Sequence, residues 1–276
     1  MIQRILTPLD NSNYTKTAMK YTCEIAKKRN AEVTGIVVLD YPDIDRKIGP
    51  IAPGGMELAE MLEKKELQDA QAHIDKLVDT FSGICTERNV KHREFEYQGR
   101  PSESVIMESA FYDLLVIGMR TYFHFETSNK PGNSLEEILD HTITPILAVP
   151  EDFKKIENVL IVCDSTPASA RALQRFSHFA ENSGYNITLL MEHKEEEYAE
   201  FYLKRAKGYL GAYGIADIKT ERVSRSVKNV IEEKYIDNVD LIVLGMHQHK
   251  SLKEFVIGSL PQYLIKENKK PLFIVQ

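Results

Sequence analysis

One segment of this chain occurs twice, and that repeat limits the folds available to it. The sequence DLLVIGM at 113–119 returns as DLIVLGM at 240–246, and each copy is followed by an apolar run after a proline. Upstream, RILTPLD ends at Asp10 and NVLIVCD ends at Asp164. Such self-similarity indicates two tandem copies of one structural unit. The first copy is the longer, with its extra residues in the middle.

Within each copy, short apolar runs alternate with segments of helical periodicity. This alternation is typical of βαβ units, which build a parallel sheet. We therefore expect two doubly wound α/β domains, residues 1–150 and 151–276, each with five parallel strands in the order 3-2-1-4-5 and helices on both faces. The expected helices include 13–29, 56–84 and 195–212, and the expected strands include 33–39, 93–98, 187–191 and 219–223.

The extra residues of the first copy include the segment 41–55, YPDIDRKIGPIAPGG. Its prolines and glycines predict an irregular surface segment. The apolar runs 146–149 and 272–275 are expected to be edge strands, and such edges must be paired or covered.

Composition excludes several classes of function. Lys plus Arg number 35 against 41 Asp plus Glu, a net charge of -6 that gives no overall attraction to nucleic acid or an anionic membrane. The cysteines Cys23, Cys85 and Cys163 form no CxxC pair, so we expect buried, reduced thiols. The start MIQRILTPLD lacks the apolar stretch of a signal peptide, and we expect a cytoplasmic protein.

The doubly wound order places candidate ligand groups at two crevices. Ligands bind such sheets beyond the carboxyl ends of the strands, where the strand order reverses. Asp10 and Gly118 are expected to flank one crevice, and Asp164 and Gly245 the other. A carboxylate there can accept a hydrogen bond from a ribose hydroxyl, but an Asp at this place is as often a helix cap. Both interpretations stay open from the sequence.

The residues at these strand ends resemble the universal stress protein family, over nearly the whole chain and as two tandem copies. Nucleotide-binding members have an Asp after the first strand and, after the fourth, the pattern G-x-x-G, nine residues, G-[S/T]. The resemblance implies a flavodoxin-like fold for each copy. The matching residues are Gly245, Met246, His247, Gln248, Gly258, Ser259 and Leu260 in the second copy, and Gly118, Met119, Arg120, Thr121, Gly132, Asn133 and Ser134 in the first.

Both copies depart from that pattern. Gln248 and Thr121 replace the second glycine, and the first copy has one extra residue before Gly132. A Cβ costs about 1 kcal/mol where positive φ is needed, or blocks a phosphate, and β-branched Thr121 is the more damaging. Basic residues outnumber acidic ones after Gly245, and the reverse holds after Gly118. If only one copy binds nucleotide, we expect it to be the second.

Several polar residues have an interpretation without a ligand. Ser134 with Glu137, and Ser259 with Gln262, also form capping boxes that stabilise a helix start. The pair His247 and His249 has no third ligand at suitable spacing, so no structural metal is expected. The chain has no Walker lysine motif and no GxSxG, so no catalytic residue is predicted.

The resemblance implies how an adenine nucleotide would lie. Adenine would contact the backbone near Val38 or Met191, the ribose would meet Asp10 or Asp164, and the phosphates would bind the glycine loop, with Mg accompanying ATP. In the family the last strand pairs across a dimer. Here that implies pairing of the two edge strands inside one molecule, a pseudo-dimer, with homodimerisation left open.

From these residues we expect a stress-response sensor or regulatory protein that binds ATP or AMP and acts on a protein partner, rather than a metabolic enzyme. Two alternatives remain. One is a partner-binding protein that has lost nucleotide binding, which Thr121 and Gln248 favour. The other is a slow ATP hydrolase.

Overall fold

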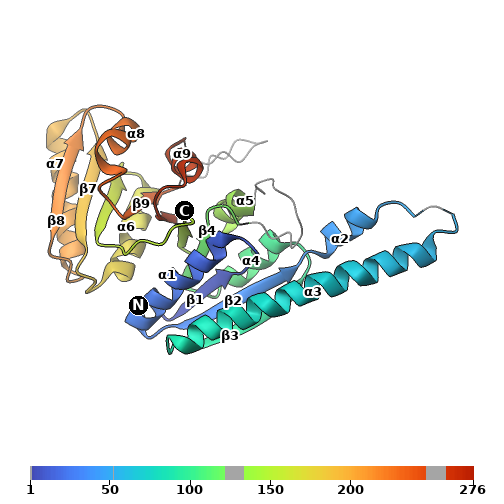
Figure 1. Cartoon of the computed structure of the whole chain (residues 1–276). Coiled ribbons are helices and arrows are strands. Elements are labelled where there is room, and N and C mark those ends of the chain that lie inside the picture. Colours follow the sequence, from blue (N-terminus) through green and yellow to red (C-terminus); the bar gives the residue numbers. More distant parts are fainter. Residues whose placement is uncertain (1, 52, 122–133, 247–258) are drawn as a thin grey trace. The chain divides into compact units, whose positions relative to one another are not determined.

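The computed structural model describes residues 2–51, 53–121, 134–246 and 259–276. The chain forms two compact units, Gln3–His141 and Thr142–Gln276, the latter joined by Met1–Ile2. We call them the first and the second unit. Each is an α/β unit with a largely parallel sheet, as the alternation of apolar runs and helical segments predicts (Figure 1).

The first unit has four parallel strands in the order β3-β2-β1-β4. Helices α1 and α3 cover one face of this sheet, while α4 and α5 pack together on the other (Figure 1). The elements are β1 (Arg4–Pro8), α1 (Asn13–Arg29), β2 (Glu32–Leu39), α2 (Tyr41–Ile48), α3 (Met56–Glu87), β3 (His92–Gln98), α4 (Pro101–Ser109), β4 (Leu114–Gly118) and α5 (Ser134–His141).

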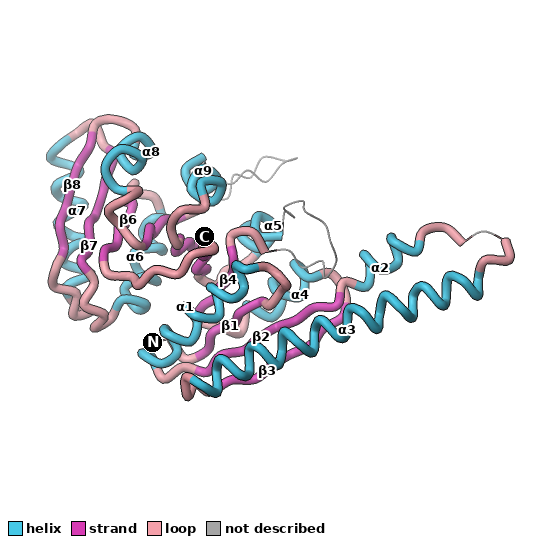
Figure 2. Tube along the Cα trace, in the orientation of Figure 1, coloured by secondary structure: helices cyan, strands magenta, loops and turns pink. Residues whose placement is uncertain are grey.

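The second unit repeats this order and has two further strands. Its order is β8-β7-β6-β9-β10, and β5 adds to β10. Helices α6 and α7 pack against one another, and α8 contacts β7 from the other face (Figure 2). The elements are β5 (Ile146–Val149), β6 (Asn158–Cys163), α6 (Pro167–Ala180), β7 (Asn186–Glu192), α7 (Glu196–Gly211), β8 (Ile218–Val223), α8 (Val227–Val230), a π-helical turn η1 (Ile231–Tyr235), β9 (Leu241–Gly245), α9 (Ser259–Glu267) and β10 (Leu272–Val275).

The two predicted edge strands pair with each other. β5 and β10 run antiparallel, with Phe273 opposite Leu147, and all four residues of each strand are buried. By the repeat, β5 is the fifth strand of the first copy. It nevertheless belongs to the second unit, because its antiparallel pairing with β10 puts its residues among those of the second copy.

The Asp that begins each copy of the repeated segment has a structural role. The Asp113 carboxylate accepts the backbone N–H of Gln3 at 2.8 Å and of Arg4 at 3.0 Å. The Asp240 carboxylate does the same for Asn158 at 2.9 Å. Each Asp therefore satisfies backbone donors where the central strand of its sheet begins.

The segment after β2 corrects one expectation. The sequence predicted an irregular segment at 41–55, but Tyr41–Ile48 is helical. The Asp40 side chain accepts the Asp43 N–H at 3.1 Å, and Pro42 lies in the first turn, both of which favour a helix start. α2 and the beginning of α3 extend past the end of β2, as Figure 2 shows. Exposed apolar side chains gather there: Ile51, Met56, Leu58, Met61 and Leu62.

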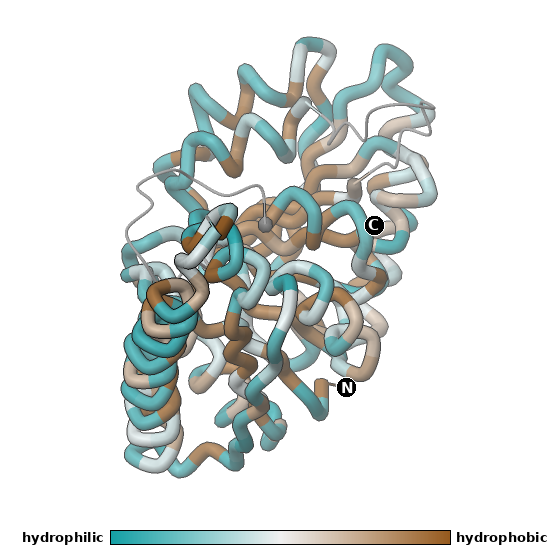
Figure 3. Tube along the Cα trace, turned by 90° about the vertical axis from the view of Figure 1, so that its right-hand side faces the viewer, coloured by the Kyte–Doolittle hydropathy of each residue, from teal (hydrophilic) through white to brown (hydrophobic). Residues whose placement is uncertain are grey.

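The core follows the strands. In Figure 3 hydrophobic residues concentrate in the strands, and the helices expose hydrophilic turns.

The three cysteines are buried and free, as predicted, and Cys23 Sγ of α1 lies 3.8 Å from Cys85 Sγ of α3. Among the described residues, no helix is both long and apolar enough to cross a membrane, and no cluster of potential metal ligands occurs.

Candidate functional site

Each unit brings an Asp and a glycine to the carboxyl ends of two adjacent parallel strands. Asp10 follows β1, Gly118 ends β4, and β1 pairs with β4. Asp164 follows β6, Gly245 ends β9, and β6 pairs with β9. In both sheets this is the position where the strand order reverses, which is where doubly wound folds bind ligands. We call these places the first and the second crevice.

In the first crevice the carboxylate is enclosed by its own turn. Asp10 is 1% exposed. Its Oδ1 accepts the Ser12 hydroxyl at 2.6 Å and the Ser12 N–H at 3.1 Å, and it also accepts the Thr15 hydroxyl. In return, the Asp10 N–H donates to Thr15 Oγ1 at 3.1 Å. These bonds hold the carboxylate inside the first turn of α1.

In the second crevice the equivalent carboxylate is exposed. Asp164 Oδ1 accepts the Thr166 N–H at 3.0 Å and the Thr166 hydroxyl at 2.5 Å. Ser169, which occupies the place of Thr15, donates instead to the Val162 carbonyl at 3.3 Å. Ser165 has φ +60, a conformation that a serine adopts only when its surroundings impose it. The turn therefore presents the Asp164 carboxylate to solvent.

The helix-cap interpretation of the two aspartates needs correction. The N-cap residues are Ser12 in α1 and Thr166 in α6, and Thr166 Oγ1 accepts the Ser169 N–H at 3.2 Å. Asp10 and Asp164 each accept the N–H of that N-cap residue, and not an N–H inside the helix. They order the turn before the helix.

The glycines ending β4 and β9 are required by packing. A Cβ on Gly245 would lie 2.3 Å from the carbonyl carbon of Ala168, and one on Gly118 would lie 2.4 Å from Tyr14 Cβ. Neither glycine has positive φ. The first turn of the helix after the central strand thus lies against each glycine, which explains their recurrence without a phosphate. Gly118 is buried, whereas Gly245 is half-buried.

Thr121, at the first departure from the family pattern, is built into the protein interior. It is 2% exposed, and its hydroxyl donates to the Gly118 carbonyl at 2.8 Å. The side chain closes the turn after β4 and fills the space that a second glycine would leave open. This closure adds to the enclosure of the first crevice.

The remaining predicted contact residues divide between buried and exposed positions. Val38 of β2 and Met191 of β7 are buried in their sheets, so only their backbone is available to a base. Met119 and Met246 are buried, Arg120 and Ser259 are exposed, and Leu260 is half-buried. Ser134 and Ser259 are the first residues of α5 and α9. His247, Gln248, Gly258, Gly132 and Asn133 lie outside the described residues.

Three residues near the crevices escaped the sequence analysis: Thr15, Ser169 and Tyr202. The first two belong to a pattern D-x-[S/T]-x-x-[S/T] that starts at Asp10 and at Asp164, so the repeat carried a signal for them. Tyr202 of α7 interacts with Ser169, and its pKa is raised by burial, by Cys163 and by the Asp164 carboxylate. Tyr202 comes from a helix that differs between the copies, and no pattern indicated it.

Comparisons with known proteins agree with this architecture. The sequence model described as "Universal stress protein family" matches residues 1–150 and 190–276. Universal stress protein Slr1230 of Synechocystis sp. is 21% identical, over 98% of this chain and 99% of that protein. Universal stress protein MJ0531 of Methanocaldococcus jannaschii is 27% identical, over 56% of this chain and 86% of that protein.

A solved structure gives the same result for the fold. The crystal structure of a universal stress protein from Archaeoglobus fulgidus DSM 4304 superposes with a TM-score of 0.74, covering 99% of this chain and 98% of that one at 17% identity. At this identity the likeness establishes the fold alone. The family match extends over most of both copies. The chain therefore belongs to the universal stress protein family.

Proposed function

We propose that this protein is a regulatory protein of the stress response that binds ATP or AMP in the second crevice. The observation that carries the proposal is the difference between the two aspartates: Asp164 is exposed at the end of β6, while Asp10 is 1% exposed at the end of β1. Only a carboxylate that solvent reaches can accept a hydrogen bond from a ribose hydroxyl without first breaking the bonds that bury it.

The surroundings of Asp164 support a nucleotide further. Thr166 binds one carboxylate oxygen and so fixes the orientation of the group before a ligand arrives. Fixing the group in advance reduces the ordering cost of binding. Half-buried Gly245 ends the neighbouring strand, and Met191 offers buried backbone one strand further along the sheet. These are the places that the family resemblance assigns to phosphate and adenine.

In the proposed role, the protein binds a nucleotide and a protein partner responds to the bound state. Nucleotide would favour one arrangement of the chain around the second crevice, and the partner would bind that arrangement preferentially. Mg would accompany ATP as the counter-ion of its phosphates.

The test compares the two aspartates in the full chain. Calorimetric titration with ATP (with Mg) and with AMP is carried out on wild type, Asp164→Asn and Asp10→Asn, after thermal unfolding has shown each variant to be folded. Asn keeps the size of the side chain and removes its charge. We expect wild type and Asp10→Asn to bind alike, and Asp164→Asn to bind at least about tenfold more weakly, as for a lost hydrogen bond to a charged group.

Two outcomes would overturn the proposal. Binding lost in Asp10→Asn but kept in Asp164→Asn would move the site to the first unit. No heat and no thermal shift with either nucleotide would leave the partner-binding alternative, which one observation favours. The first unit exposes an apolar cluster where α2 meets α3, including Met56, Leu58 and Met61, and such clusters mark protein contacts.

A further inference from the structure

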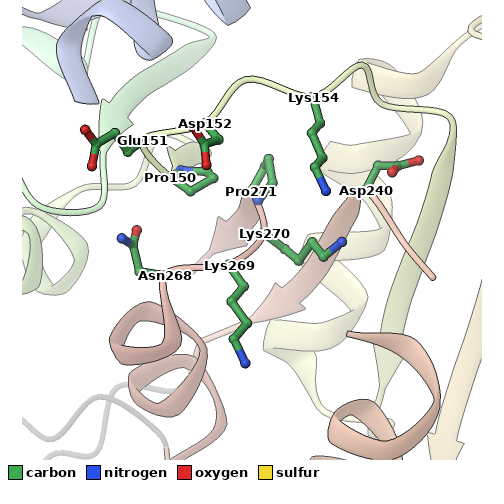
Figure 4. Close-up of a pocket in the computed structure, with 9 residues that line it drawn as sticks. All are labelled: Pro150, Glu151, Asp152, Lys154, Asp240, Asn268, Lys269, Lys270 and Pro271. Atoms are coloured by element: carbon green, nitrogen blue, oxygen red, sulfur yellow. The ribbon is translucent and has the colours of Figure 1, made fainter. Parts of the chain in front are cut away.

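We propose a second ligand site in the second unit, a pocket for a small phosphate-type oxyanion held by Lys270 and Lys154. The pocket has a volume of about 310 Å³ and is formed by the residues that follow β5 and those that precede β9 and β10 (Figure 4). It lies at the edge of the sheet where β6 and β9 begin, as the bonds from Asp240 to the start of β6 show. Asp164 lies at the other end of β6, so this pocket is separate from the second crevice.

Lys270 is the residue that carries the inference. The residue is 7% exposed, a rare position for a lysine, and it lines the pocket. Within the described parts of the chain its ammonium makes no ion pair and no hydrogen bond. Its neighbour Lys269 differs, because it pairs with Glu267 at 3.0 Å on the protein surface.

Lys154 brings a second positive charge to the same pocket. Figure 4 shows the side chains of Lys154 and Lys270 reaching toward the same region, with Glu151 and Asp152 on the other side of the pocket. A second positive charge strengthens the attraction of the pocket for an anion. Burial and then the charge of Lys154 lower the pKa of Lys270.

The nearby carboxylates do not remove the need for a ligand. Asp240 and Asp237 act on Lys270 through space and raise its pKa, but burial and Lys154 outweigh them. The Asp240 carboxylate is engaged by the backbone N–H groups of Glu157 and Asn158 at 3.2 and 2.9 Å. An oxyanion would supply an acceptor to Lys270, and a phosphate group offers several oxygens that lysines bind as point charges.

The experiment is a titration of the ¹⁵N-labelled full chain with inorganic phosphate, followed by amide chemical shifts, with sodium chloride keeping the ionic strength constant. The variants are Lys270→Met, Lys154→Met and the control Lys269→Met, which removes the same charge from a lining residue whose ammonium pairs with Glu267. Thermal unfolding confirms that each is folded. Amides near Glu151 and Lys270 report the pocket, and amides near Asp164 report the second crevice.

We expect saturable shifts at the pocket amides in wild type and in Lys269→Met. The affinity for phosphate should fall about tenfold in Lys270→Met and also fall in Lys154→Met, because each substitution removes one of the two positive charges in the pocket. Equal affinity in Lys270→Met and Lys269→Met would overturn the proposal. So would shifts that never saturate or that occur only near Asp164. Because the two sets of amides are distinct, this result is independent of whether nucleotide binds the second crevice.

Discussion

The two crevices start from the same pattern and end in different states. Asp10 and Asp164 each precede a hydroxyl two residues later and another five residues later. Thr15 donates its hydroxyl to Asp10, whereas Ser169 donates to the Val162 carbonyl. Threonine is stiff at χ1, and serine turns more freely between acceptors. A single methyl group at this position therefore accompanies the change from an enclosed carboxylate to an exposed one.

The residue that packs against the glycine also differs between the two crevices. Tyr14 lies against Gly118, and Ala168 takes its place against Gly245. The first crevice thus has the larger residue at this position, and Thr121 is buried at the end of β4. The comparison teaches that a repeated motif fixes where a carboxylate lies, while the residues packed around it decide whether a ligand reaches it.

The largest expected effect concerns the glycines that both crevices share. Gly245→Ala would place Cβ 2.3 Å from the backbone of Ala168, so α6 must shift, and we expect a loss of about 3 kcal/mol in unfolding free energy. Gly118→Ala meets Tyr14 Cβ at 2.4 Å and should cost about 2 kcal/mol. Urea unfolding measures both. The control Gly208→Ala in α7 has no atom near its Cβ and should leave stability equal or higher.

If Gly245→Ala proved as stable as Gly208→Ala, the glycine would not be a packing residue, and its recurrence would have to be explained by a ligand.

An effect of intermediate size on stability should distinguish the hydroxyls of Thr15 and Ser169. Thr15→Val keeps the shape of the side chain and leaves the buried Asp10 carboxylate short of a donor, so we expect a loss of about 2 kcal/mol. Ser169→Ala removes two bonds of 3.3 Å beside an exposed Asp164 and should cost about 1 kcal/mol or less. Urea unfolding of both variants is the measurement. Equal losses would show that enclosure of Asp10 does not depend on Thr15.

The smallest expected effect is a pH dependence that each unit should show. The Tyr97 hydroxyl donates to Glu108 at 2.9 Å, and the Tyr235 hydroxyl donates to Glu221 at 2.6 Å. The bond to Glu108 raises the pKa of Tyr97, and burial followed by the bond to Glu221 raises the pKa of Tyr235 more strongly. Because the folded state keeps these protons longer, their stabilisation is complete below pH 10 and is lost as pH rises above it.

Unfolding at pH 8 and pH 11 tests this expectation. Tyr235→Phe should reduce the alkaline loss of stability by about 1 kcal/mol, the usual net contribution of a hydrogen bond, and Tyr97→Phe should reduce it less. A larger effect of Tyr97→Phe would reverse the order, and the sheet edge of the first unit would then be the more sensitive to pH.

Much of the fold followed from local pattern. The α1 helix matches the predicted 13–29, and α3 starts at the predicted residue 56 and ends at Glu87 instead of 84. The prediction of an irregular segment at 41–55 was wrong for Tyr41–Ile48. The prolines and glycines suggested a loop, whereas Asp40 caps a helix there. That helix packs along α3, and a contact between distant residues leaves no mark on local composition.

The sequence by itself determined the alternation of strands and helices in two copies, the placement of Asp10 and Asp164 after the first strand of each copy, and the apolar runs expected to be edge strands. Each of these depends on periodicity and spacing, which are local. Only the tertiary structure decided that β5 belongs to the second unit, that Asp164 is exposed while Asp10 is buried, and that Lys270 lies in a pocket. Burial is set by residues far away in the chain, and exposure of a polar group is what makes it available to a ligand.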